Sequence, residues 1–237
     1  MPVAIYIRRH VEEPETFRRL AAARAAGTVR QVGLLEMLRT HGRETLTGMG
    51  LIVAGTVAVY ISFTYLVTFS TVTLKLPLRE TFMVQLASAF LMLVLMPFVG
   101  AASDRIGRRP ILIGSLLGYL VVIHPLYSWL VSDPGIDRLL TVQLVISVFV
   151  AAFFGVVSTV MAELFPANVR SLGMSMAYNL AVMIFGGFAQ FIVTWLIRAT
   201  GSPMSAAYYV MFGVALGAIA SFMVRERAHD PHIDHHD

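Results

Sequence analysis

Six uncharged apolar stretches constrain the fold of this chain more than any other feature of its sequence. All 18 Lys+Arg and all 14 Asp+Glu residues lie outside them. A helix needs about twenty apolar residues to cross a hydrocarbon core of roughly 30 Å, and each stretch is long enough. Backbone groups in lipid must hydrogen-bond within the protein, which favours helices over the shorter alternating strands of a barrel. The stretches cover residues 48–69, 81–102, 111–131, 139–162, 172–197 and 204–224.

The sequence therefore predicts an all-α integral membrane protein with six transmembrane helices. Its composition agrees, since 14% of the residues are charged and 57% are hydrophobic, whereas a soluble domain is about 25% charged. The absence of cysteine excludes disulfides and thiolate chemistry. We read the net charge of +4 as a matter of membrane topology and expect no nucleic-acid partner.

The distribution of basic residues predicts the orientation in the membrane. Of the 18 Lys+Arg residues, only four belong to the loops after the first, third and fifth spans, namely Lys75, Arg79, Arg138 and Arg198. The others lie in the N-terminal stretch, the loops at 103–110 and 163–171, and the tail. The positive-inside rule then predicts that this second group, with both termini, is cytoplasmic.

Four segments follow from this pattern. Residues 1–7 resemble the end of a truncated transmembrane helix, and 8–47 form a polar, Arg-rich cytoplasmic central loop. Residues 48–224 hold the six spans, which by their number could form two inverted groups of three. Residues 225–237 form a His/Asp-rich cytoplasmic tail. This tail could bind a metal or sense pH, but such tails are commonly solvated, and we expect no metal site.

Polar side chains in the spans are the candidates for solute contact, because they usually face a bundle interior or a cavity. In the first span, Thr56, Tyr60, Thr64 and Thr68 recur every four residues, with Tyr65 beside them. This stripe predicts a cavity face for a hydrogen-bonding solute. The alternative is that each Thr hydroxyl bonds a carbonyl of its own helix.

The fifth span carries Tyr178, Asn179 and Gln190, with the pair Gly186–Gly187 between them. Solute contact and hydrogen bonding between helices both remain open for these amides, and the glycine pair allows close packing or a bend. The patterns Gly114–Gly118 and Gly213–Gly217 indicate packing between helices of this chain rather than dimerisation. No span contains Asp, Glu, Lys or Arg, so the segment has no evident proton-coupling residue.

No pattern in the chain indicates catalysis. It has no nucleophile elbow, zinc-spaced histidine pair, phosphate loop or dinucleotide fingerprint. We therefore expect neither an enzyme nor a cofactor.

The loop after the second span, "GAASDRIGRRP" at residues 100–110, resembles the signature loop of the major facilitator superfamily, G-x-x-x-D-R-x-G-R-R. A six-helix unit with this loop after its second span resembles one half of such a carrier. The residues that match the pattern are Gly100, Asp104, Arg105, Gly107, Arg108 and Arg109.

Neighbouring segments resemble the C-terminal half of the metabolite:proton symporter family, and above all its citrate and tricarboxylate symporters. They are "YIRRHVEEPETFR", "LPLRETFMVQLASAF", "ELFPANVRSLGMSMAYNLAVMIFGG" and "FMVRER". The resemblance implies symport of a small organic acid with protons, by alternating access, in the bacterial inner membrane. It also implies membrane lipid as a partner and an N-terminal half, missing or separate, that holds the coupling charges.

The resemblance also implies a gating role for the loop. We expect Gly100 to allow close helix approach and Gly107 a tight turn. Asp104 is expected to face the N-terminal end of the fifth span, near Arg170 and Gly173. Arg105 is expected to pair with Glu163, while Arg108 and Arg109 either meet anionic lipid or only anchor the topology.

The bend of the fifth span and the function both leave alternatives open. Gln190 stands where close relatives often have proline, which puts the bend of the fifth span in doubt. A transport-inactive scaffold, a channel-like oligomer, and a symporter for α-ketoglutarate, shikimate or proline/betaine remain as other functions.

Overall fold

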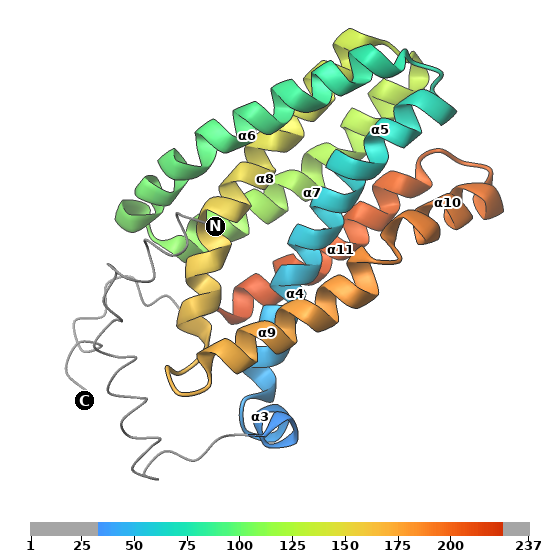
Figure 1. Ribbon diagram of the computed structural model, residues 1–237. Helices are drawn as coiled ribbons and strands as arrows, with labels where there is room; N and C mark the ends of the chain where they lie inside the picture. The colour runs from blue at the N-terminus through green and yellow to red at the C-terminus, as the bar shows by residue number, and fades with distance from the viewer. Residues whose placement is uncertain (1–32, 225–237) are drawn as a thin grey trace, which may run out of the picture.

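The computed structural model describes residues 33–224 as an all-helical bundle, drawn in Figure 1. Within this range, six helical segments are long and apolar enough to cross a membrane. Each coincides with one of the predicted apolar stretches, so the prediction of six membrane helices is confirmed. The expected segments 1–7 and 225–237, and residues 8–32 of the expected central loop, lie outside the described residues. The six spans are Gly42–Thr73, Leu78–Ile106, Arg108–Ser132, Ile136–Leu164, Arg170–Thr200 and Ser205–Met223.

Four of the spans are single helices and two are composite. The single ones are α6 (Leu78–Ile106), α7 (Arg108–Ser132), α8 (Ile136–Leu164) and α11 (Ser205–Met223). The first span joins α4 (Gly42–Val59), the π-helix η1 (Tyr60–Tyr65), α5 (Leu66–Thr68) and the π-helix η2 (Phe69–Thr73). The fifth joins α9 (Arg170–Ala181), the π-helix η3 (Val182–Gly186) and α10 (Ala189–Thr200). A short helix, α3 (Leu34–Thr40), precedes them.

The fifth span is interrupted at its glycine pair. The π-helix η3 ends at Gly186, and α10 begins only at Ala189. Glycine allows this because it adds no side chain at the point where the helix must change its winding. The interruption therefore exists with Gln190 in place of proline, and the doubt about this bend is removed.

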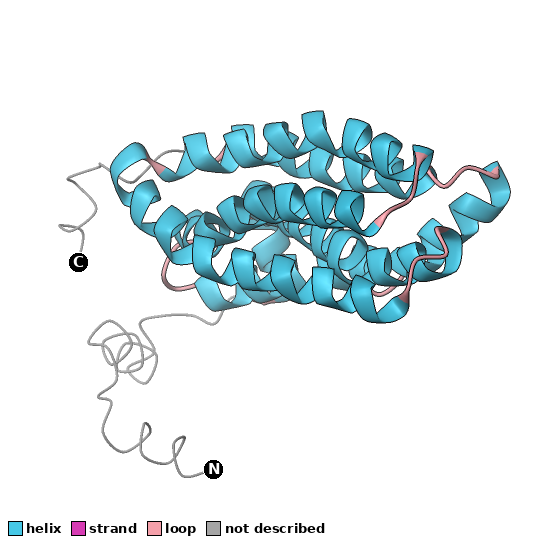
Figure 2. Cartoon of the chain, turned by 90° about the horizontal axis from the view of Figure 1, so that it is seen from above, coloured by secondary structure: helices cyan, strands magenta, loops and turns pink. Residues whose placement is uncertain are grey.

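The spans pack as expected for two related groups of three, with the second and third helix of each group packing on the first helix of the other group. Helix α6 packs on α8 as α9 packs on α4, and α7 packs on α8 as α11 packs on α4. The equivalent helices α7 and α11 also pack on each other. Figure 2 shows the connecting loops gathered at the ends of the bundle. The arrangement supports the interpretation of two related groups of three helices.

Burial differs strongly between the spans. The most apolar window of the first span is 61% buried in the bundle, whereas that of α6 is 11% buried. The first span is therefore a central helix, and α6 lies at the edge. The outward side chains of α6, such as Phe90, Leu93 and Phe98, remain available to lipid or to another protein segment.

Two glycines in the turns between spans have positive φ. Gly107 has φ 102° between α6 and α7, and Gly201 has φ 68° after α10. Glycine reaches this region without the Cβ clash that other residues meet. The expected tight turn at Gly107 is confirmed.

Small residues let α11 lie close against α4. A Cβ atom added to Gly217 would lie 2.2 Å from the Cβ of Ala54, and one added to Gly213 would lie 2.8 Å from Val57. In α7, a Cβ on Gly118 would lie 2.4 Å from the Phe149 ring of α8, while Gly114 faces open space. The Gly213–Gly217 pattern thus packs within the chain, as predicted, and the Gly114–Gly118 pattern does so through Gly118 alone.

We predict that Gly217→Leu destabilises the bundle, because the added side chain must displace α11 from α4. Overpacking of this kind typically costs roughly 1–3 kcal/mol. The measurement is thermal unfolding of the purified chain in detergent. Gly114→Leu is the matched control, since it adds the same side chain at the open glycine of the other pattern. Equal melting temperatures for the two variants would contradict the close contact.

Candidate functional site

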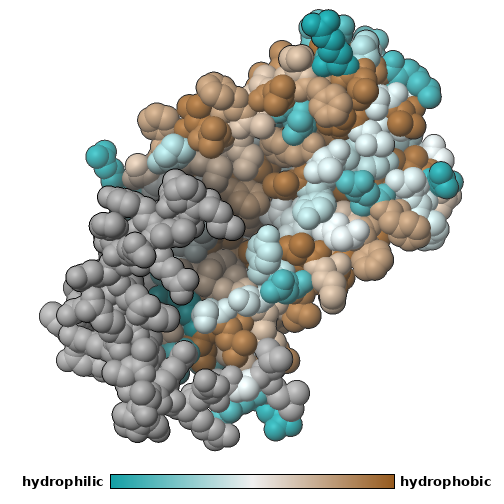
Figure 3. Space-filling model, viewed as in Figure 1, coloured by the Kyte–Doolittle hydropathy of each residue, from teal (hydrophilic) through white to brown (hydrophobic). Residues whose placement is uncertain are grey.

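A pocket of about 290 Å³ opens near the middle of the bundle, between α4, α6, α8 and the α9–η3 segment. Its wall combines aliphatic, aromatic and hydroxyl side chains. The lining residues are Ile52, Gly55, Thr56, Val59, Tyr60, Met92, Phe153, Phe154, Val157, Tyr178 and Val182. Figure 3 shows this face hollowed between α6 and α9, with pale and teal polar residues along α4 and α5. The pocket is the candidate functional site.

Two of the predicted solute-contact residues, Tyr60 and Tyr178, line the pocket directly. Thr64 and Thr68 continue from Tyr60 along the first span as exposed residues. In the described part of the chain, no hydrogen bond joins the Thr56, Thr64 or Thr68 hydroxyl to its own helix, whereas Thr71 donates to the Val67 carbonyl at 2.9 Å. These three hydroxyls are therefore not self-bonded, and solute contact along the stripe stays a prediction.

Tyr65 departs from the expected stripe. Its side chain is 6% exposed and lies against the Phe69 ring, with the ring centres 6.3 Å apart. The phenol belongs to the core of the bundle, so the expectation that Tyr65 faces a solute is corrected.

Asn179 is exposed beside Tyr178 on α9. Its Nδ2 donates to the Ser175 carbonyl of the same helix at 2.8 Å. The amide is thus not bonded to another helix of the described chain, and its Oδ1 stays available to a ligand. Of the two interpretations left open by the sequence, solute contact fits this position better.

Close contact between η3 and α4 sets the shape of the pocket. A Cβ atom on Gly186 would lie 2.9 Å from Thr56 Cγ2 and 3.5 Å from the Tyr60 ring. Only glycine permits this approach, which brings the fifth span against the polar stripe of the first. The glycine pair thereby places Tyr178 and Tyr60 on the same pocket.

The pocket contains residues that the sequence did not single out. Phe153 and Phe154 of α8 pack edge to face, with ring centres 5.4 Å apart, and Met92 of α6 lies opposite. Apolar residues inside a membrane span carry no sequence signal that separates pocket wall from core. None of the lining side chains is charged, so this wall offers hydrogen bonds and aromatic surface but no counter-charge.

The loop that resembles the superfamily signature lies at the end of the bundle predicted to be cytoplasmic. Arg108, the first residue of α7, forms an ion pair with Glu163 near the end of α8. Arg105, which was expected to pair with Glu163, is exposed instead. The physical reason is the turn at Gly107: it reverses the chain so that the side chain after the turn, not the one before it, reaches α8.

Asp104 also differs from its expected placement. Its side chain is 68% exposed, and its Oδ1 lies 3.4 Å from Nη2 of Arg108, one turn further along the chain. Among the described residues, Asp104 forms no hydrogen bond or ion pair with Arg170 or Gly173 at the start of α9. A Cβ at Gly100 would lie 3.5 Å from the Gly155 carbonyl, an ordinary van der Waals distance, so the approach of α6 to α8 does not require this glycine. The tighter position is Gly155, where a Cβ would lie 3.0 Å from the Met96 carbonyl.

Two further arginines bind the carbonyl ends of helices. Nη2 of Arg109 donates to the Phe222 carbonyl in the last turn of α11 at 3.2 Å. Nε of Arg170 donates to the Phe165 carbonyl that follows α8 at 3.4 Å. Basic side chains stabilise C-terminal carbonyls that lack a donor within the helix. Arg109 is thus more than a topological anchor, since it ties α7 to α11.

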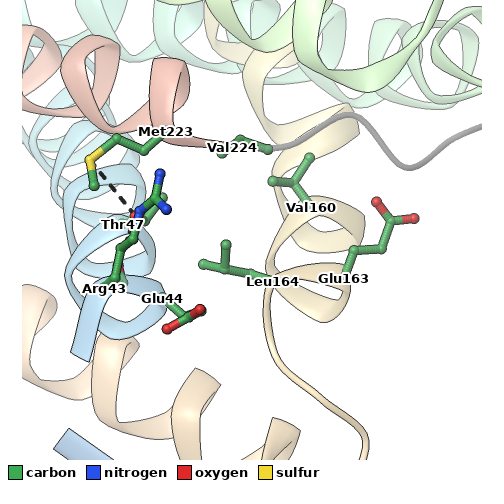
Figure 4. Close-up of a pocket in the computed structure, with 8 residues that line it drawn as sticks. All are labelled: Arg43, Glu44, Thr47, Val160, Glu163, Leu164, Met223 and Val224. Atoms are coloured by element: carbon green, nitrogen blue, oxygen red, sulfur yellow. Dashed lines mark hydrogen bonds between the residues drawn. The ribbon is translucent and has the colours of Figure 1, made fainter. Parts of the chain in front are cut away.

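A second, smaller pocket of about 130 Å³ lies at the same end, between α4, α8 and α11. Figure 4 shows that Arg43, Glu44 and Thr47 of α4 border it on one side and that the Glu163 carboxylate lies across from Glu44. Thr47 Oγ1 donates to the Arg43 carbonyl at 2.8 Å. In residues 33–224, no group of three His, Asp or Glu side chains could hold a metal ion; the histidine-rich tail lies outside this range.

Comparisons with known proteins agree with this arrangement. Residues 12–236 match the family model described as "Sugar (and other) transporter". The chain is 32% identical over 228 residues to a citrate-proton symporter of Klebsiella pneumoniae, which covers 96% of this chain and 50% of that protein. No solved structure matches.

Other relatives carry different names. An alpha-ketoglutarate permease of Escherichia coli K12 is 28% identical over 230 residues, covering 95% of this chain and 50% of its own. A proline/betaine transporter of the same organism is 26% identical over 236 residues, covering 97% and 47%. The chain therefore spans about half the length of these relatives. The matched family model covers most of the chain, and the six spans and the loop at residues 100–109 agree with it. The chain belongs to the sugar (and other) transporter family of the major facilitator superfamily.

Proposed function

We propose that this chain is the C-terminal half of a proton-coupled symporter for a small organic acid of the citrate type, working by alternating access. The observation that carries the proposal is the pocket near the middle of the spans, where hydroxyl groups face an otherwise apolar cavity. Polar side chains inside membrane spans usually face the bundle interior or a water-filled cavity. The names of the relatives support a metabolite as the solute.

The chemistry of the pocket defines the contribution of this half. The hydroxyls of Thr56, Tyr60 and Tyr178 can donate hydrogen bonds to carboxylate or hydroxyl oxygens of an acid. The lining has no cation to neutralise a carboxylate and no acid to carry the coupled proton. We therefore assign both tasks to the N-terminal half, which would close over the pocket from the other side.

The loop supplies the second part of the proposed mechanism. The Arg108–Glu163 pair fixes the loop to α8, and the turn at Gly107 leaves Asp104 exposed. We propose that Asp104 and Arg105 meet the other half when the cytoplasmic side closes. Contacts made in one state only shift the population toward that state.

The transport prediction concerns membrane vesicles that contain the chain with and without a co-expressed N-terminal half. We expect labelled citrate or a related acid to accumulate only with both halves present and with an imposed pH gradient. Vesicles without the chain are the control. Uptake independent of the chain for every acid tested would contradict the proposal and favour a scaffold role.

A second prediction concerns the pocket face. The chain has no native cysteine, so Tyr60→Cys, Thr64→Cys and Asn179→Cys each introduce one thiol. We expect all three to react with a water-soluble thiol reagent, because Tyr60 lines the open pocket and the other two are exposed beside it. Tyr65→Cys is the buried control. If the three react no faster than the control, the assignment of a water-filled cavity is wrong.

A third prediction concerns the loop. Asp104→Asn is expected to lower transport by the two-half protein without lowering its amount in the membrane, because the exposed carboxylate contributes to gating and not to folding. The measurement is initial uptake at matched protein levels. Arg105→Gln, the neighbouring exposed position, shows whether any charge change has the same effect. Unchanged uptake with Asp104→Asn would remove this residue from the gate.

A further inference from the structure

The π-helical turn η1 is hydrogen-bonded by side chains of two other helices, α7 and α8. In a π-helix each backbone N–H bonds the carbonyl five residues back, as the Leu66 N–H does to Ile61. Such turns are rare and are frequently found at functional sites. Within η1, the Ser62 carbonyl accepts a hydrogen bond from Nε2 of Gln143 at 3.1 Å. The Ser62 hydroxyl shares a bond of 2.6 Å with the Tyr119 hydroxyl of α7.

Gln143 acts here as a double donor. It lies on α8 with 2% of its surface exposed, and its Nε2 also donates to Oε1 of Gln85 on α6 at 3.1 Å. The Ser62 carbonyl can only accept a hydrogen bond, and the Gln85 amide oxygen accepts one as well. If the Gln143 amide were flipped, its oxygen would face the Ser62 carbonyl, and no hydrogen bond could form between these two acceptors. The amide orientation is therefore determined by Ser62, and η1 is joined to α8 and α6 through this one side chain.

This arrangement leaves polar atoms without partners. Oε1 of Gln143 and the hydroxyl of Tyr127 are buried and have no hydrogen-bond partner among the described residues. An apolar residue of similar shape would avoid such an unpaired group. A residue needed only for packing has no reason to be Gln at this position, so its function is to be sought in the bond to η1.

We propose that Gln143 is a positioning residue for the central pocket: its bond to the Ser62 carbonyl keeps η1 in the π register. The register decides which side chains face the cavity, since successive residues of a helix point about 100° apart. At present Tyr60 lines the pocket, Thr64 is exposed and Tyr65 is buried. If this turn returned to α geometry, the residues on either side of it would be offset by one position around the helix axis. The polar stripe would then rotate away from the cavity.

Thiol labelling tests the register directly and needs no transport activity. The reporters are Thr64→Cys and Tyr65→Cys in this chain, which has no native cysteine, labelled in membranes with a methanethiosulfonate reagent. With Gln143→Met, which is similar in size but cannot donate, labelling of Thr64→Cys is expected to fall about tenfold and that of Tyr65→Cys to rise. A tenfold change is the size expected for loss of one buried hydrogen bond.

The controls separate the Ser62 bond from general packing. Gln85→Met removes the other acceptor and leaves the bond to Ser62 in place, so both labelling rates should stay within about twofold of the parent. Asn179→Cys on α9 reports on a face that the change should not reach. If Gln143→Met does not accumulate in the membrane, Gln143→Asn, whose shorter side chain cannot reach Ser62, replaces it.

Unchanged labelling of Thr64→Cys and Tyr65→Cys in the accumulated Gln143 variant overturns the inference. Equal changes with Gln85→Met overturn it as well.

The link to the pocket rests on the proposed function and has its own readout. In uptake assays, Gln143→Met is expected to raise KM about tenfold while the maximal rate at saturating solute changes less, because the contact groups are misplaced and the gate is intact. A lowered maximal rate with unchanged KM contradicts a positioning role. If neither the parent nor the variant transports any acid, the proposed function fails, and the labelling result still decides the register.

Discussion

The absence of water from the membrane interior is the constraint on which this structure depends. Every backbone N–H and C=O in the six spans must find a partner inside the protein, and an α-helix meets that demand without help. Where the helix departs from α geometry, another group must supply the missing bond. The clearest case is η1, where Gln143 reaches from α8 to the Ser62 carbonyl. In η3 the Phe185 carbonyl likewise accepts a hydrogen bond from the Tyr209 hydroxyl at 3.3 Å. Both η1 and η3 lie beside the central pocket.

The same constraint explains what could be predicted from the sequence. Six spans follow from the positions of charged residues, because a charge at membrane depth is costly wherever the helix packs. The turn at Gly107 and the packing of Gly213 and Gly217 follow from local rules about residues without a side chain. The polar stripe of the first span also follows, as far as Tyr60 and Thr64, from simple helical periodicity.

Other features depend on the winding and on distant partners, which local rules do not contain. Its position next to Thr64 predicts that Tyr65 faces the cavity, but its ring packs on Phe69 within the bundle, a contact that the spacing of polar residues does not reveal. The partner of Glu163 depends on the direction in which the chain leaves Gly107, and it is Arg108 rather than Arg105. The pocket-lining positions of Phe153 and Phe154 could not be predicted, because apolar residues have the same sequence pattern on a pocket wall and in a core.

The arginines at the predicted cytoplasmic end have a consequence for how the protein keeps its orientation. Basic residues direct a helix during insertion through their number, whatever their later contacts. Arg109 and Arg170 donate hydrogen bonds to backbone carbonyls at the C-terminal ends of α11 and α8, and Arg108 binds Glu163. Moving these residues to the opposite loops would alter the insertion signal and, at the same time, expose helix ends in the finished bundle. A variant with these arginines moved would therefore lose stability as well as its insertion signal, so the same residues serve both orientation and packing.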